Sequence, residues 1–344
     1  MNLLIFNTSL YSFILNPDST TGSAQSRLYN EKQRRAEDLN QIVAVGDSRM
    51  GFFPRYPNQR RSEIAYTFAS LAVPGSSPRA WYYILRDADP MATRYRAVLI
   101  PLDDYDDAET WEDFSNREAD LNYLLPLLGW KDIPEFVRSY SDPWIRLRVL
   151  EGLLLKGSVY KRDFQDFLLH PKARIQRANA SRRDSAKWFY NYEGTSDSMK
   201  DVRLDWTART IAVPPEVSPA RAQDFRGRFL DPQAPQQGHH GAYLRYWLGK
   251  ICERYRGTGT QIVFLRLPRG PFIRPDQPPY NPHSTVRDLA AGNRDVMLLS
   301  EHTLDDLERP ELFTDELHMN GPGCAQFSLE LARAVRAALG PPRS

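Results

Sequence analysis

Short apolar runs alternate along this chain with segments whose apolar residues follow helical spacing. Four runs are bounded by turn residues and are typical of buried strands: residues 42–45, 97–102, 261–267 and 295–299. Residues 63–73 are a further strand candidate, ending at Pro74-Gly75. Helical spacing is found at residues 78–89, 242–255 and 323–339. This alternation predicts an α/β domain with a parallel sheet and right-handed crossovers.

The alternating pattern is interrupted between about residues 103 and 241 by a long polar and aromatic stretch. Helices are expected there at residues 121–128, 144–155 and 159–169, and a strongly basic segment follows at 172–183. Residues 214–238 are rich in Pro, Gln and Arg and are predicted to be loop. We interpret the whole stretch as one mostly helical insertion in a domain that spans residues 31–344.

The first 15 residues are rich in apolar side chains but include Asn7, Thr8 and Ser9. The segment is shorter than the roughly 20 residues of a membrane-spanning helix. It also lacks the basic start and the small-residue cleavage site of a signal peptide. Two interpretations stay open: an amphipathic segment that packs on the domain, or the stub of a membrane anchor. Residues 1–30 are therefore treated as one N-terminal unit, in which the apolar segment at 1–15 is followed by a linker that begins with residues 16–23.

Composition sets few limits on the function. The chain has 344 residues, with 45 Lys and Arg against 43 Asp and Glu, a formal charge of +2. This balance does not call for nucleic acid or an anionic membrane as a partner. Cys252 and Cys324 are far apart and not in a metal-ligand spacing. A disulfide between them stays open.

Polar residues stand at two strand ends and before the last helix. The first strand ends in Gly46-Asp47-Ser48 and the second in Pro74-Gly75-Ser76-Ser77, while Asp315 and His318 precede the final helix. The carboxyl ends of parallel strands meet at one edge of a sheet, where sites form. A serine hydroxyl needs a base, and the base needs a carboxylate to orient it. We therefore expect Ser48 as nucleophile, His318 as base and Asp315 as its partner, with the Ser48 and Gly75 N–H groups as oxyanion donors.

Three segments resemble the sequence blocks of the SGNH/GDSL hydrolase superfamily. They are VAVGDSRM at residues 43–50, LAVPGSS at 71–77 and FTDELHMNGPGCAQFS at 313–328. The resemblance implies a three-layer, flavodoxin-like SGNH fold and a Ser-His-Asp triad of Ser48, His318 and Asp315. It also assigns an oxyanion role to Gly75. It covers residues 40–110 and 240–340, and it does not extend to the insertion.

One position departs from the esterase pattern of that superfamily. Esterases carry Gly-x-Asn-Asp after the third strand, and the Asn side chain donates to the oxyanion; this chain has Pro101-Leu102-Asp103-Asp104. An ionised Asp103 cannot donate a hydrogen bond. The departure points toward cell-envelope SGNH-like proteins of the alginate-acetylation or D-alanyl-transfer type. Members of that branch work outside the cytoplasm, often membrane-anchored, beside a membrane-bound O-acyltransferase.

We therefore expect an O-acyltransferase or esterase that acts on O-acyl groups of a cell-envelope polysaccharide or exopolysaccharide, at the periplasmic or extracellular face. A plain carbohydrate esterase or deacetylase is one alternative, and a non-catalytic SGNH-like subunit of a polysaccharide export complex is another. A cytoplasmic location also stays open. No cofactor, metal or nucleic acid is expected, and the partner is the acyl acceptor.

Other candidate residues have two interpretations each. Arg49, Arg266 and Asn320 are candidate substrate-binding residues, although solvated arginines near a loop would look the same. The acidic run 103–107 is either a cation site or a charged loop. His239 and His240 could bind zinc, but no third ligand is near them in the sequence. The tryptophans of the insertion, among them Trp130 and Trp144, are expected in the core, with stacking on sugar rings as the alternative.

Overall fold

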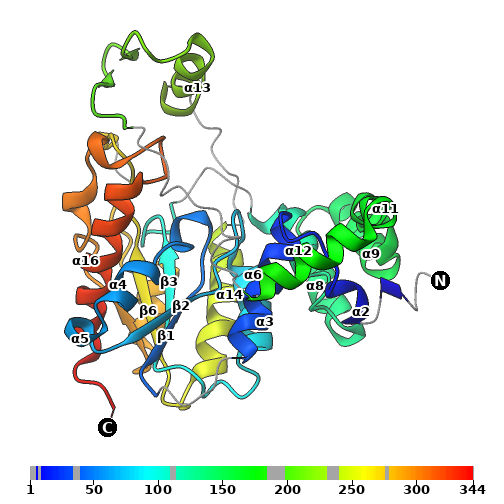
Figure 1. Cartoon of the computed structure of the whole chain (residues 1–344). Coiled ribbons are helices and arrows are strands. Elements are labelled where there is room, and N and C mark those ends of the chain that lie inside the picture. The colour runs from blue at the N-terminus through cyan, green and yellow to red at the C-terminus, as the bar shows by residue number, and fades with distance from the viewer. Residues whose placement is uncertain are drawn as a thin grey trace.

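A five-stranded parallel sheet forms the centre of the molecule (Figure 1). The computed structural model describes residues 5–6, 9–33, 39–108, 114–183, 198–230, 240–275 and 279–343. The strands are β1 (Gln41–Ala44), β2 (Thr67–Ser70), β3 (Ala97–Leu102), β6 (Gln261–Arg266) and β7 (Val296–Leu298). Their order, β2-β1-β3-β6-β7, is the doubly wound order found in flavodoxin. The predicted α/β fold with a central parallel sheet is confirmed.

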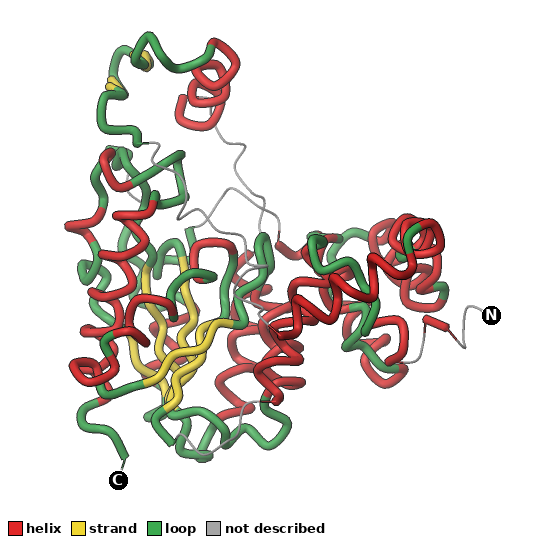
Figure 2. Tube along the Cα trace, in the orientation of Figure 1, coloured by secondary structure: helices red, strands yellow, loops and turns green. Residues whose placement is uncertain are grey.

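Successive side chains of each strand enter different cores because a strand alternates its faces. Val43 and Val98 belong to one core, together with Ile84 of α6 (Pro78–Ala88) and Trp247 of α14 (His240–Tyr255). Ile42, Leu99 and Val263 belong to the other core, which includes α16 (Gly321–Leu339). Helices therefore cover both faces of the sheet (Figure 2). The predicted stripe on α16 is confirmed by the burial of four residues: Phe327, Leu331, Val335 and Leu339.

Shorter helices complete these two layers. They are α4 (Arg55–Gln59), α5 (Arg61–Ile64) and α15 (Thr285–Ala291). The strand prediction at residues 63–73 is too long, because only Thr67–Ser70 pairs with β1. Ala65 adopts the left-handed conformation at φ +66°, which ends α5 and separates it from the strand.

The insertion after β3 is largely helical, as predicted, and forms a lobe beside the sheet (Figure 1). We call residues 119–183 the helical lobe. Its helices are α7 (Ala119–Leu124), α8 (Ile133–Arg138), α9 (Pro143–Leu154), α10 (Lys156–Val159), α11 (Lys161–Leu169) and α12 (Pro171–Arg183). An antiparallel pair follows, made of β4 (Arg203–Asp205) and β5 (Thr210–Ala212).

Two parts of the insertion differ from the sequence predictions. The predicted loop at 214–238 contains α13 (Pro219–Leu230), because Phe225 and Phe229 lie one turn apart and are both buried; residues 231–238 lie outside the described part. Trp130 and Trp144, expected in the core, are exposed by 62% and 75%. Trp111 and Trp188 also lie outside the described part.

The N-terminal segment packs on the helical lobe. Tyr11 of α2 (Ser9–Ser12) donates a 2.6 Å hydrogen bond to Asp163 of α11, and its ring is buried. The stretch expected as a linker at 16–23 instead contains the start of α3 (Thr20–Gln33), which packs against α12. None of the helices in the described ranges has the length and hydrophobicity of a membrane span. Cys252 and Cys324 are both buried free thiols.

Candidate active site

The ends of β1, β2 and β3 meet at Gly46, two residues before Ser48. Gly46 has φ +133°, and a methyl group on it would lie 2.6 Å from Cγ of Pro101, so glycine is required there. Its carbonyl accepts hydrogen bonds from the Val73 N–H and the Ser76 hydroxyl, both at 2.9 Å. These contacts hold the loops after β1 and β2 together beside Ser48.

Ser48 and His318 are in hydrogen-bond contact although they are 270 positions apart in the chain. Ser48 Oγ lies 2.8 Å from His318 Nε2. On the other side of the ring, His318 Nδ1 lies 2.9 Å from Asp315 Oδ2. An ionised carboxylate only accepts, so Nδ1 carries the proton and Nε2 is left to accept from the serine. The three residues predicted to form a triad are therefore brought together in the order that nucleophilic catalysis needs.

A tight turn holds Asp315 against the imidazole. Asp315 Oδ1 accepts from the backbone N–H groups of Leu317 and His318, at 2.9 and 2.7 Å. Burial works against ionisation of Asp315, but these hydrogen bonds and the imidazole hold its pKa below the ordinary value. Because the pKa is lowered on folding, the stabilisation is complete above the ordinary aspartate pKa and is lost as pH falls through the lowered value. Asp315 is thus ionised at neutral pH.

The expected oxyanion donors are the backbone N–H groups of Ser48 and Gly75. Within the described ranges, neither N–H has a hydrogen-bond acceptor, which is a condition for the predicted role. Gly75 has φ +66°, and a methyl group on it would lie 2.7 Å from Arg117 Nη2. Arg117, which comes from the insertion, was not predicted near the site, since no sequence motif links it to Gly75.

Arg49 connects the loops after β1 and β3 through two carboxylates. Its Nη2 lies 2.7 Å from Asp47 Oδ2, and its Nη1 lies 2.5 Å from Asp103 Oδ1. Burial opposes the charge of Arg49, but Asp103 and Asp47 together raise its pKa above the ordinary value. The negative charge of Asp103 is therefore offset by the guanidinium of Arg49.

Replacing Arg49 with glutamine is expected to lower the free energy of unfolding by about 2–4 kcal/mol, because two largely buried carboxylates lose their cation. Asp103→Asn added to Arg49→Gln should recover part of that loss by removing one unpaired charge. Denaturant unfolding of the two variants measures both effects. Equal stability of Arg49→Gln and the unchanged protein would show that the pair contributes nothing.

Two small, partly open cavities flank Arg49. The first lies beside His318 and is lined almost entirely by apolar side chains: Phe52, Leu267, Pro268, Phe313, Leu317, Met319 and Phe327. The second combines polar with apolar groups: Asp47, Ser76, Asp103, Trp81, Phe114 and Leu244. The sheet edge that carries Ser48 thus has one apolar cavity and one mixed cavity.

No known family model matches this sequence, and no curated protein is similar enough to it to count as a match. The interpretation of the site therefore rests on its motifs and its geometry.

Two other predicted substrate-binding residues, Arg266 and Asn320, have partners within the protein. Arg266 donates from Nε to the Glu301 carbonyl at 2.6 Å and pairs with Asp305 and Glu308. Asn320 caps α16: its Oδ1 accepts from the Gly323 N–H at 3.0 Å, and its buried side chain donates to the Glu311 carbonyl. Neither residue lines the two cavities described above.

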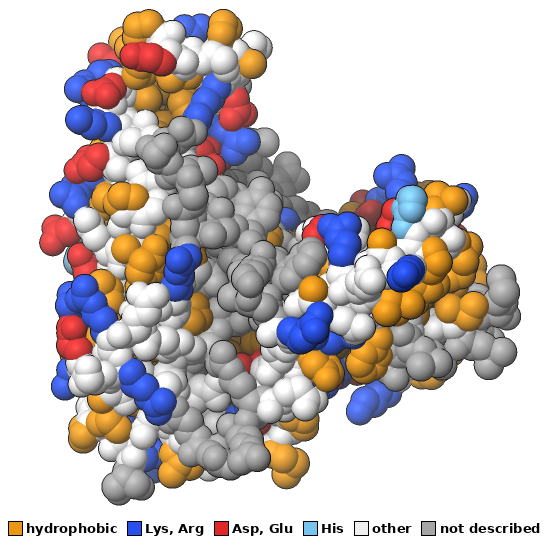
Figure 3. All heavy atoms as spheres, in the orientation of Figure 1, with side chains coloured by type: hydrophobic (Ala, Val, Ile, Leu, Met, Phe, Trp, Pro, Cys, Tyr) orange, Lys and Arg blue, Asp and Glu red, His pale blue; other side chains and the backbone are white. Residues whose placement is uncertain are grey.

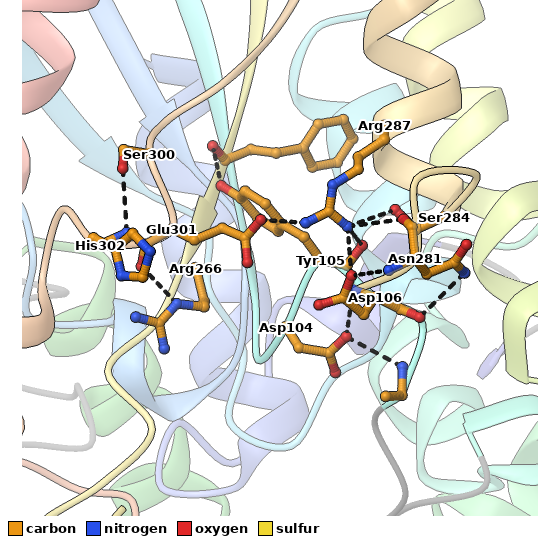
Figure 4. A network of polar contacts seen from close by, with 12 residues as sticks. Asp104, Tyr105, Asp106, Arg266, Asn281, Ser284, Arg287, Ser300, Glu301 and His302 are labelled. Atoms are coloured by element: carbon orange, nitrogen blue, oxygen red, sulfur yellow. Dashed lines mark hydrogen bonds and ion pairs between the residues drawn. The ribbon is translucent and has the colours of Figure 1, made fainter. Parts of the chain in front are cut away.

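The acidic run after β3 is used in contacts within the protein (Figure 4). Asp104 Oδ1 accepts from the Asp106 and Ala108 N–H groups, and Asp106 pairs with Arg287 at 2.6 Å. Asp107 accepts from Thr285. In the described part of the chain, no group of three or more His, Cys, Asp or Glu side chains could hold a metal ion. His239 and the side chain of His240 lie outside it.

A second histidine near the sheet edge resembles His318 only in part. His302 Nδ1 lies 2.7 Å from Asp305 Oδ2. The nearby Ser300 hydroxyl accepts from the His302 backbone N–H (Figure 4). Within the described ranges, no hydroxyl contacts the imidazole of His302, which is largely exposed. His302 therefore provides an internal comparison for the triad.

Proposed function

We propose that this protein is an SGNH/GDSL-type serine enzyme that transfers or hydrolyses O-acyl groups of a cell-envelope polysaccharide or exopolysaccharide. The observation that carries the proposal is the hydrogen-bond relay from Ser48 through His318 to Asp315 at the carboxyl edge of the sheet. The resemblance of residues 43–50 and 313–328 to the superfamily blocks supports the same assignment.

In the proposed reaction, Ser48 Oγ attacks the carbonyl carbon of the ester and passes its proton to His318 Nε2. The carbonyl oxygen takes up the electron pair and is stabilised by the N–H groups of Ser48 and Gly75. Collapse of the tetrahedral intermediate breaks the bond to the leaving oxygen, which takes the proton from His318. A sugar hydroxyl or water then attacks the acyl-enzyme by the same steps and regenerates Ser48.

The two cavities suggest where the two parts of the substrate, the acyl group and the sugar, would lie. The apolar cavity beside His318 suits the acyl group, because its lining offers few hydrogen-bond partners. We assign the sugar to the side of the mixed cavity, where Asp47 and Asp103 offer acceptor oxygens to hydroxyls and the buried Trp81 forms part of the wall. Trp81 is held in place by a 2.8 Å hydrogen bond from Nε1 to Ser76.

The proposed setting is the periplasmic or extracellular face of the envelope. The reason is the Asp103 departure, which resembles the envelope branch of the superfamily. In that setting, a membrane-bound O-acyltransferase supplies the acyl group and a polysaccharide accepts it.

The test is acyl partition from 4-nitrophenyl acetate, with release of 4-nitrophenol and acetylation of added glycans followed together. Acetyl transfer to a glycan in preference to water supports transferase activity, and release that glycans do not change supports the esterase alternative. If 4-nitrophenol were released no faster than in a sample without protein, both the transferase and the esterase activity would be contradicted. The non-catalytic subunit would then be the remaining alternative.

A further inference from the structure

An exposed apolar surface lies on the helical lobe, outside the candidate active site. Within the described ranges, seven of the thirteen exposed large hydrophobic side chains fall between residues 143 and 175. Six of these come from α9, α11 and the residue that follows α9, and we call them the lobe patch: Trp144, Leu147, Leu154, Leu155, Leu168 and Leu169. Monomeric soluble proteins rarely gather so many exposed apolar side chains without a partner.

Helix geometry places part of the lobe patch on one side of α9. Trp144, Leu147 and Leu154 are separated by three and seven residues, so their side chains project within about 80° of one another around the helix axis. The opposite side of α9 is buried, at Val149 and Leu153. α10 packs against both α9 and α11 and so links the two helices that carry the patch.

The same segment has an excess of basic residues, although Arg148 and Arg177 pair with Glu118 and Asp18 outside it. Residues 143–183 contain ten Lys and Arg but only three Asp and Glu, whereas the whole chain has 45 against 43. Two of the three acids, Asp163 and Asp166, are already paired with the buried Arg174. Lys161, Arg162 and Lys172 are exposed. Figure 3 shows hydrophobic and basic side chains gathered on this lobe.

We propose that the lobe patch docks the protein on an anionic lipid bilayer. Exposed Trp and Leu side chains gain by entering the boundary between headgroups and acyl chains, and basic residues around them are attracted to anionic headgroups. A second copy of the chain fits this surface less well, because it would oppose two faces that both carry net positive charge.

The N-terminal segment adds to this surface. Phe13 is 43% exposed, and Arg182 lies 4.5 Å from the centre of its ring. Asp163 also accepts from the Asn16 N–H at 3.0 Å, so α11 fixes the end of the segment. The residues around Phe13 therefore belong to the same end of the molecule as the lobe patch.

Co-sedimentation of the full chain with vesicles tests the proposal. Vesicles of phosphatidylcholine with phosphatidylglycerol should bind at least about tenfold more tightly than phosphatidylcholine alone, and salt should weaken the binding. Leu168→Ser combined with Leu169→Ser should reduce binding about tenfold or more. Lys161→Glu combined with Arg162→Glu should reduce it by roughly fivefold or more for each cation replaced.

Leu39→Ser combined with Met91→Ser is the matched control, since both residues are exposed apolar side chains outside the lobe. It should bind vesicles like the unchanged protein, and equal unfolding midpoints would show that all variants are folded. Equal binding to both lipid compositions, or full binding by the Leu168→Ser and Leu169→Ser variant, would overturn the proposal. The proposal would also be overturned if the protein formed a dimer in solution and the Leu168→Ser and Leu169→Ser variant were a monomer.

Discussion

Replacing Ser48 with alanine is expected to abolish covalent labelling by a fluorophosphonate and to reduce ester hydrolysis by about 10³-fold or more. The reason is that Ser48 supplies the only nucleophile of the proposed relay, and its hydroxyl is the group that contacts His318 Nε2 at 2.8 Å. The fold should be unaffected, because the removed oxygen leaves the backbone contacts at Gly46 in place. Labelling followed by mass spectrometry of the modified peptide measures the effect directly.

His318 and His302 offer a matched comparison for the same experiment. Both imidazoles contact an aspartate through Nδ1, but His318 is also hydrogen-bonded to a serine hydroxyl. His318→Ala should therefore lose activity to a degree similar to Ser48→Ala, whereas His302→Ala should retain it. Persistent labelling of the Ser48→Ala variant would show that the reactive nucleophile lies elsewhere.

Asp120→Ala is expected to lower the free energy of unfolding by about 3–5 kcal/mol, because it leaves the buried Arg79 without its carboxylate. The Arg79 and Asp120 side chains are both fully buried, with Arg79 Nη2 2.9 Å from Asp120 Oδ2. Burial opposes the charge of Arg79, while Tyr243 and Asp120 raise its pKa above the ordinary value. This pair joins α6, beside the Gly75 loop, to α7 of the insertion, so it connects the site to the helical lobe.

Denaturant unfolding measures the Asp120 effect. Asp120→Asn is a milder variant, because an amide oxygen can still accept from the Ser77 hydroxyl, now 2.6 Å from the carboxylate. Asp87→Asn is the control, since the Lys32–Asp87 pair is more exposed, and we expect almost no change there. Equal losses for Asp120→Ala and Asp87→Asn would contradict the structural role of the buried pair.

Much of the sheet and the triad could be predicted because local patterns fix them. The apolar runs at 97–102 and 261–267 stand out from the polar sequence on either side and so predict buried strands. The structure confirms both as strands. The strand-end rule then placed Ser48 at one edge of the sheet. Asp315 and His318 are three residues apart, so a single turn brings the carboxylate to the imidazole.

Predictions failed where burial decided the outcome. The Pro- and Gln-rich composition of residues 214–238 favoured a loop, yet Phe225 and Phe229 stabilise α13 through a tertiary core. The roles of Arg266 and Asn320 as candidate ligand contacts stay predictions, although both residues have internal partners in the structure. A polar side chain near a site has the same appearance in sequence whether its partner is substrate or protein.

The sequence by itself determined the parallel α/β architecture and the identity of the proposed triad, because hydrophobic period and strand-end position are local properties of the chain. Only the tertiary structure decided that Arg49 pairs with Asp103, that Arg117 lies beside Gly75 and that the side chains of the lobe patch face solvent. These features depend on which distant segments fold against one another, and an apolar residue in a helix has the same pattern whether its face is covered or exposed.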